Sequence, residues 1–198
     1  MKALFFGETG RSLFGIYHPP HIHVRQAQAV LLCYPGVHEY NSAHWAFRRL
    51  AGMLARAGHH VLRFDYFGTG DSEGMSEDFM PARCAEDTRR AAAELMDLSG
   101  ARKLSLVGLR LGASFALEAC RGGLNVQNAI LWEPVVSGAE YLSELESRDA
   151  LRNILLLHWV VARKRRSELL GFPMTDEQRR ALDALDTTEG TTPSVDKI

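Results

Sequence analysis

The segment Lys103–Ser114, with the sequence KLSLVGLRLGAS, decides the fold. Its first half is mostly apolar, which is typical of a strand in a parallel sheet that helices cover on both faces. Gly108 and Gly112 then bracket a sharp turn, and apolar residues recur at helical spacing as far as Arg121. The segment therefore predicts a buried strand, a tight turn and a helix in direct succession.

Strand and helix patterns alternate on both sides of this segment. The predicted strands are Ala29–Tyr34, His60–Phe64, Lys103–Val107 and Asn128–Trp132. The predicted helices run from about Ser42 to Gly58, from Pro81 to Gly100 and from Gly112 to Arg121. This order is typical of right-handed βαβ units, so the sequence predicts an α/β fold with a mostly parallel sheet and helices on both faces. Lys2–Phe6 and Leu13–Tyr17 would add a hairpin at the sheet edge.

The chain changes character after Pro134. Helical spacing continues from Ser137 to about Leu170, a short helix is expected at Asp176–Leu185, and no strand pattern follows Trp132. We therefore expect a core, a helical cap and a disordered polar tail, at residues 1–135, 136–185 and 186–198.

The composition narrows the classes of function. The chain has 198 residues, of which 46% are hydrophobic, and 23 Lys and Arg against 24 Asp and Glu give a net charge of -1. A chain of this length can bury a hydrophobic core without disulfides or a structural metal. Its near-zero net charge argues against nucleic-acid binding, which rests on a basic face. The same balance gives no general attraction to anionic lipid. We therefore do not expect the basic-ended stretch ILLLHWVVARKRR (Ile154–Arg166) to contact a membrane surface.

The cysteines and histidines predict neither a disulfide framework nor a metal site. Three cysteines at wide spacing match no such pattern: Cys33, Cys84 and Cys120. His18, His21 and His23 are clustered, but no suitably spaced Cys, Asp or Glu completes a ligand set, so no metal or other cofactor is expected. The amino terminus lacks the apolar region of a secretory signal, and the sequence predicts a cytoplasmic protein.

Glycine-rich and polar loops follow the predicted strands, at the edge where α/β sheets bind ligands. The loop FDYFGTGDSEG (Phe64–Gly74) resembles the D-x-x-G-x-G-x-S loop of α/β hydrolases, in the branch of serine aminopeptidase-like enzymes. GLRLGAS (Gly108–Ser114) lies where that family has its nucleophile elbow, G-x-S-x-G, and PGVHEY (Pro35–Tyr40) lies where it has an oxyanion-hole loop. With LWEPVVSGAEYL (Leu131–Leu142), the set most resembles the hydrolase-like proteins encoded with exosortase systems, type 2.

This resemblance covers about Gly15 to Leu145 and implies action on an acyl ester or thioester, but the sequence departs from the family pattern. The elbow tip is Arg110, whose protonated guanidinium cannot attack a carbonyl carbon. The last strands, which supply the histidine and the acid of the triad, have no counterpart after Trp132. Two interpretations stay open: a nominal acyl hydrolase, and an inactive hydrolase-like protein that binds an acyl or anionic ligand or a partner protein.

The resemblance marks Arg110, Glu133 and His38 as candidate catalytic residues, and the backbone N–H groups of Val37 and Leu111 as candidate oxyanion-hole donors. Arg110 either binds an anion at the helix N-terminus, or pairs with Glu133 or another acid and fills the pocket. His38 either faces the site or makes a hydrogen bond within its loop.

Four further residues near these loops have both a structural and a reactive interpretation. Ser114, one helical turn past Arg110, is either a displaced nucleophile or, more commonly for a helical serine, a buried structural residue. His44 flanks the oxyanion-type loop and could face the site. Asp65 and Ser72 are expected to form hydrogen bonds of the turn.

The absence of further strands after Trp132 predicts an uncovered sheet edge at Asn128–Trp132. An exposed edge presents unpaired N–H and C=O groups to other chains. We therefore expect the chain to form a homodimer through this edge or to aggregate, and to bind a small acyl or anionic ligand.

Overall fold

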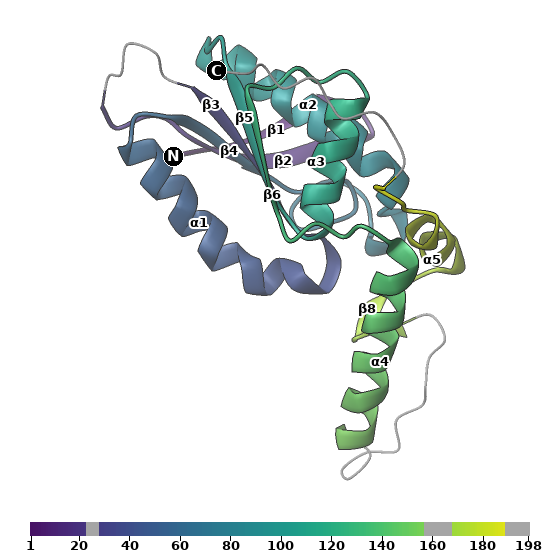
Figure 1. Ribbon diagram of the computed structural model, residues 1–198. Coiled ribbons are helices and arrows are strands. Elements are labelled where there is room, and N and C mark those ends of the chain that lie inside the picture. Colours follow the sequence, from purple (N-terminus) through teal and green to yellow (C-terminus); the bar gives the residue numbers. More distant parts are fainter. Residues whose placement is uncertain (23–27, 157–167, 189–198) are drawn as a thin grey trace.

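The computed structural model describes residues 1–22, 28–156 and 168–188 (Figure 1). The main sheet has six strands in the order β1-β2-β4-β3-β5-β6. In chain order these are β1 (Lys2–Glu8), β2 (Arg11–His18), β3 (Ala29–Cys33), β4 (His60–Phe64), β5 (Leu104–Leu109) and β6 (Asn128–Trp132). The last four are parallel to one another, and the β1–β2 hairpin joins them through an antiparallel pairing of β2 with β4. The predicted α/β class and mostly parallel sheet are confirmed.

Helices cover both faces of the sheet. Helix α1 (Tyr40–Arg56) lies on one face, and α2 (Pro81–Ser99) and α3 (Leu111–Arg121) pack side by side on the other (Figure 1). Helix α4 (Gly138–Leu156) extends away from the sheet, and α5 (Asp176–Asp183) packs against α4 and α2. No helix in these described segments is long and apolar enough to cross a bilayer.

The core lies between the parallel strands and these helices. All five residues of β3 are buried, as the apolar strand pattern predicts. The chain leaves β3 through α1 to β4 on one side, and returns through α2 to β5 on the other side. The carboxyl ends of β3 and β5 therefore flank a topological switch point, where α/β sheets bind ligands.

Two predictions about helices are wrong. Helix α1 begins at Tyr40 with Glu39 at its N-cap, not near Ser42. The helix predicted as far as Leu170 ends at Leu156 within the described residues, and a short hairpin follows residues 157–167, which lie outside them.

This hairpin also contradicts the prediction that no strand follows Trp132. It pairs β7 (Glu168–Leu169) with β8 (Phe172–Pro173). Leu170 and Gly171 both have positive φ, 53° and 86°, as a two-residue turn of type I′ requires. Most of the apolar-basic stretch and residues 189–198 of the predicted tail lie outside the described residues.

Candidate functional site

The turn between β5 and α3 has the backbone of a nucleophile elbow. Arg110 occupies its tip with φ 53° and ψ -123°, a conformation that is strained for any residue with a side chain. A Cβ atom at Gly112 would collide with the backbone oxygen of Tyr34, so glycine is needed where α3 approaches β3. The sequence therefore keeps the elbow geometry while it replaces the residue that the elbow presents.

The Arg110 side chain is held in a cluster of acidic residues. Its Nε donates to Glu39 Oε1 at 3.1 Å, and its Nη2 donates to Glu144 Oε2 at 3.0 Å. Glu133, the predicted partner, is more distant, with Oε1 at 3.9 Å from Nη1. The guanidinium lies 5.2 Å from the centre of the Tyr141 ring, whose hydroxyl donates to Glu39 Oε2 at 3.0 Å. Arg110 thus fills the space in front of the elbow.

Acidic groups outnumber basic groups in this cluster. Burial acts to lower the pKa of Arg110, but Glu39 and Glu144 outweigh it, so that the pKa lies above its ordinary value. Arg148 adds a second guanidinium at 3.3 Å from Glu144. With Glu133, three carboxylates face two guanidinium groups, and the cluster has no spare positive charge to offer to an anion.

Ser114 is placed as a structural residue. Its side chain is fully buried in α3, and its hydroxyl donates to the backbone oxygen of Val135 at 2.7 Å. The cysteines offer no substitute nucleophile, because Cys33, Cys84 and Cys120 are all buried. Burial raises the pKa of Cys33 to about 12, which leaves it a neutral thiol at ordinary pH.

His38 lies in the short 3-10 helix η1 (Val37–Glu39), with its ring centre 6.2 Å from that of Tyr141. Its Nε2 is buried and has no hydrogen-bond partner within the described part of the chain. Burial lowers the pKa of His38, so the neutral ring is favoured. His38 therefore has the protonation state of a base, but no hydroxyl or thiol of the described residues is hydrogen-bonded to its Nε2.

The two candidate oxyanion donors follow neighbouring strands. Val37 begins η1 after β3, and Leu111 begins α3 after β5. As the first residue of its helix, Leu111 has no intrahelical acceptor for its N–H. His38 and Leu111 line a hollow beside the elbow of only about 10 Å³, too small for a ligand.

Other polar residues named from the sequence have structural partners. Asp65 accepts from the Tyr40 hydroxyl at 2.8 Å and from the Asp71 N–H at 3.0 Å, and the Ser72 hydroxyl donates to the Asp65 backbone oxygen at 2.6 Å. The turn role predicted for Asp65 and Ser72 is confirmed. His44 stacks on Tyr34, with ring centres 6.2 Å apart.

The predicted absence of a histidine metal site is not contradicted. His18 is buried on β2 and accepts from Arg63 Nε at 3.2 Å. No cluster of His, Cys, Asp or Glu in residues 1–22, 28–156 and 168–188 could hold a metal ion, and His23 lies outside these segments.

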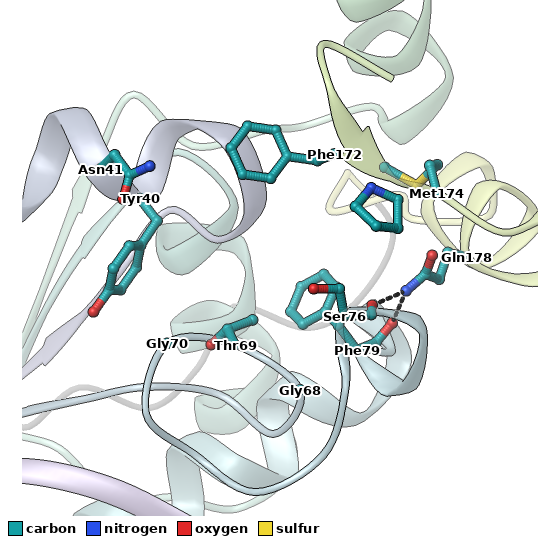
Figure 2. A pocket seen from close by; sticks show the side chains of 11 residues that line it. Tyr40, Asn41, Gly68, Thr69, Gly70, Ser76, Phe79, Phe172, Met174 and Gln178 are labelled. Carbon is teal, nitrogen blue, oxygen red and sulfur yellow. Dashed lines mark hydrogen bonds between the residues drawn. The ribbon is translucent and has the colours of Figure 1, made fainter. Parts of the chain in front are cut away.

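A pocket that the sequence did not reveal lies next to the elbow hollow (Figure 2). Its volume is about 190 Å³. It lies between the first turn of α1, the loop after β4, and the segment from β8 to α5. The lining residues are Tyr40, Asn41, Gly68, Thr69, Gly70, Ser76, Phe79, Phe172, Pro173, Met174 and Gln178.

The lining of this pocket is neutral and mostly apolar. Phe79, Phe172 and Met174 form its apolar walls, and none of the lining residues in the described segments is charged. The side chains of Asn41 and Ser76 provide polar groups at the rim, because both residues are exposed. Such a lining suits a small neutral molecule with a carbonyl group and an apolar part.

Gln178 fixes the wall that the pocket shares with the elbow hollow. Its Nε2 donates to the backbone oxygens of Ser76 at 2.7 Å and Phe79 at 2.8 Å (Figure 2). Its Oε1 accepts from the N–H of Thr175 at 2.7 Å, as part of the capping box of α5. The Nε2 group of this wall residue thus holds the loop after β4 against α5, and its Oε1 caps the start of α5.

Some site residues that the sequence analysis did not name could have been inferred from their spacing or position. Tyr141 and Glu144 are three residues apart, so a helix places them on one face, and Glu39 lies within the loop that was already singled out. Nothing local in the sequence indicated that Phe172 and Gln178 would meet the loop after β4.

No family model and no curated protein matches this sequence. Among solved structures, an esterase from Pyrococcus furiosus is 19% identical with a TM-score of 0.58, over 78% of this chain and 58% of the esterase. A proline iminopeptidase from Mycobacterium smegmatis is 15% identical with a TM-score of 0.57, over 79% and 53%. An alpha-beta serine hydrolase homologue from Coxiella burnetii is 16% identical with a TM-score of 0.54, over 65% and 60%.

These likenesses define the class of the fold. Together with the sheet order and the elbow turn, they show that the chain has the α/β-hydrolase fold. The chain spans between 53% and 60% of the length of these three proteins. Identities this low show the fold alone and favour no branch of it.

Proposed function

We propose that this protein is a non-catalytic protein of α/β-hydrolase fold that binds a small neutral acyl compound in the pocket of Figure 2. The observation that carries the proposal is the placement of Arg110 at the elbow tip. There it is hydrogen-bonded to Glu39 and Glu144, in the place from which a nucleophile would attack.

Three observations support the absence of catalysis. The Arg110 guanidinium is no nucleophile, Ser114 is buried with its hydroxyl committed to Val135, and His38 has no described hydrogen-bond partner at Nε2. Acyl transfer through a triad needs a nucleophile within hydrogen-bond reach of its base.

The pocket favours a neutral acyl ligand over an anionic one. Its described lining has no cation, and the neighbouring Arg110 is neutralised by its acidic partners. At about 190 Å³ the pocket is smaller than the ~300–1,000 Å³ of drug-sized sites, so a short acyl chain is the appropriate size. Asn41 could donate to the carbonyl oxygen of an ester or amide, while Phe79 and Phe172 contact the chain.

The competing proposal is hydrolysis of an acyl ester or thioester, in association with an exosortase-type system. The retained elbow backbone favours it, as does the N–H of Leu111, which has no acceptor within its own helix. This proposal requires a water or side-chain nucleophile that the described residues around Arg110 do not supply.

A ligand-binding experiment tests the pocket. We expect ethyl hexanoate and hexanamide to bind in ligand-observed NMR or calorimetry, and the hexanoate anion to bind at least tenfold more weakly. Asn41→Trp should abolish binding by filling the pocket. Ser42→Trp is the matched control, because Ser42 is exposed on the same helical turn and does not line the pocket. Stronger binding of the anion, lost in Arg110→Ala, would overturn the neutral-ligand proposal.

A hydrolysis assay tests the absence of catalysis. Purified protein, an Arg110→Ala variant and a heat-inactivated blank are incubated with short acyl esters and acyl thioesters. We expect no turnover above the blank in either protein. Turnover by the wild type that disappears in Arg110→Ala would instead establish the competing proposal, with Arg110 as an electrostatic group.

A further inference from the structure

Strand β6 forms an open edge of the sheet. It pairs with β5 on one side, and no other described strand pairs with it on the other side. Ile130 and Trp132 are 56% and 58% exposed. Because alternate residues of a strand point to the same face, these two large apolar side chains lie next to each other on the surface.

The backbone of β6 offers hydrogen bonds outward at Ala129 and Leu131. The N–H of Arg110, which follows β5, donates to the C=O of Trp132 at 3.0 Å. In a parallel ladder, alternate residues bond to the same neighbouring strand, so Asn128, Ile130 and Trp132 bond to β5. The N–H and C=O groups of Ala129 and Leu131 then point to the open side.

The opposite edge of the sheet is protected, whereas β6 is not. Strand β1 has Lys2 and Glu8 at its two ends, and charged side chains are a common device against edge pairing. Strand β6 has the sequence NAILW, without charge, proline or glycine. An uncharged edge with exposed apolar side chains is suited to pairing with another strand.

We propose that β6 pairs antiparallel with β6 of a second copy of this chain, about a two-fold axis through Ile130. In this register Ile130 meets its own counterpart as a non-hydrogen-bonded pair, and Asn128 lies opposite Trp132. Ala129 and Leu131 form the hydrogen bonds between the two copies. The contact is self-complementary, so it closes as a dimer, with a continuous sheet across the two copies. It is independent of the ligand proposed for the pocket.

The charges beside β6 favour the antiparallel arrangement. The exposed Glu133 follows the carboxyl end of β6, and the exposed Arg102 and Lys103 precede β5 at the opposite end. Antiparallel pairing brings Glu133 of each copy toward the basic end of the other. A parallel arrangement would bring like charges together at both ends.

Light scattering and sedimentation of the full 198-residue chain test the dimer. We expect a mass of twice 22.1 kDa that dissociates on dilution. Ile130→Lys should raise the dissociation constant at least tenfold. Phe5→Lys, on the exposed face of β1, is the matched control and should leave it unchanged. Circular dichroism would establish that both variants are folded.

Cross-linking and charge reversal test the register. Residues that face each other as a non-hydrogen-bonded pair have Cα atoms about 4.5 Å apart, within the range of a disulfide, so Ile130→Cys should cross-link two copies on oxidation. Phe5→Cys should not. Glu133→Lys should weaken the dimer, and adding Lys103→Glu should restore it.

Three outcomes would overturn the proposal. A monomer at every concentration would mean that another part of the chain, or nothing, covers β6. A dimer that Ile130→Lys does not weaken would place the contact elsewhere. A dimer that the single change Glu133→Lys strengthens would exclude the antiparallel arrangement.

Discussion

Two hollows lie side by side at the carboxyl ends of the strands, and they differ in size and in surroundings. The elbow hollow has a volume of only about 10 Å³ and lies beside the charged cluster of Arg110, whereas its neighbour has a volume of about 190 Å³ and a neutral lining. They share a wall of Phe79, Met174 and Gln178. The difference teaches that the most recognisable motif of the chain need not mark the place where a ligand can enter.

The largest loss of stability is expected from a change that pushes the elbow turn away from β3. Gly112→Ala places a Cβ against the backbone of β3, and overpacking of this kind costs about 3 kcal/mol of unfolding free energy. Gly52→Ala is the control, because Gly52 lies within α1 and its added Cβ would contact only the Arg56 side chain at 3.4 Å. Urea denaturation should show that this control is neutral or more stable. Equal effects of the two changes would contradict a tightly packed elbow.

Loss of the Arg110 side chain should rank second. Arg110→Ala leaves Glu39 partly buried beside two other carboxylates, at an expected cost of about 2 kcal/mol. Glu133→Gln should cost under about 0.5 kcal/mol, because Glu133 is 71% exposed and its contact is long. Arg110→Gly should be about 1 kcal/mol more stable than Arg110→Ala, since glycine relieves the strained φ. If Glu133→Gln cost as much unfolding free energy as Arg110→Ala, the predicted pair of Arg110 with Glu133 would be the main interaction of Arg110.

A change in the wall that the two hollows share should affect both stability and ligand binding. Gln178→Ala leaves the backbone oxygens of Ser76 and Phe79 without their donor, which we expect to cost about 1–2 kcal/mol. It should also weaken binding of ethyl hexanoate, because the wall is no longer fixed. Glu177→Ala, at an exposed neighbouring position of α5, should change neither quantity measurably. Unaltered binding in Gln178→Ala would show that the pocket does not depend on this wall.

The smallest effect should be the contribution of His38, in the elbow hollow, to the pH dependence of stability. Burial lowers the pKa of His38 in the folded protein, although Glu39 and Glu144 act in the opposite direction. The unfolded chain therefore binds a proton more readily, so stability contributed by neutral His38 is present above about pH 6.5 and is lost as pH falls below it.

His38→Phe should lose less stability than the wild type between neutral and mildly acidic pH. Part of the slope should persist, because burial and Arg63 lower the pKa of His18 to about 4. Thermal unfolding at a series of pH values measures both slopes. Parallel curves for the two proteins would mean that His38 titrates alike in the folded and unfolded chains.

The sequence predicted most of the sheet because its signals there are local. Apolar strands and the helix-ending Gly100 depend on neighbouring residues only, and Gly100 indeed has φ 61° at the C-cap of α2. Glu39 provides no side-chain hydrogen bond to the start of α1, so the boundary of that helix had no recognisable cap. The strands β7 and β8 have two residues each, too short for a periodic pattern.

Of the candidate site, the sequence predicted only the elbow and its replaced residue, Arg110. The replacement at position 110 is visible in the sequence because the flanking glycines mark the elbow. The partners of Arg110 come from α4 and η1, and the pocket combines α1, the loop after β4 and α5, so both depend on long-range packing. No local pattern encodes such contacts.

The hydrogen bonds of Gln178 also have a consequence for the order of folding. They join residues that are 102 and 99 positions apart in the sequence. Closing so long a loop costs chain entropy before the contacts compensate for it, so we expect these bonds to form late. On a ribosome, the sheet can assemble while the pocket still lacks its far wall. Hydrogen exchange should accordingly show amides of α5 opening more readily than those of β3, and a ligand that fills the pocket should slow exchange in α5 most.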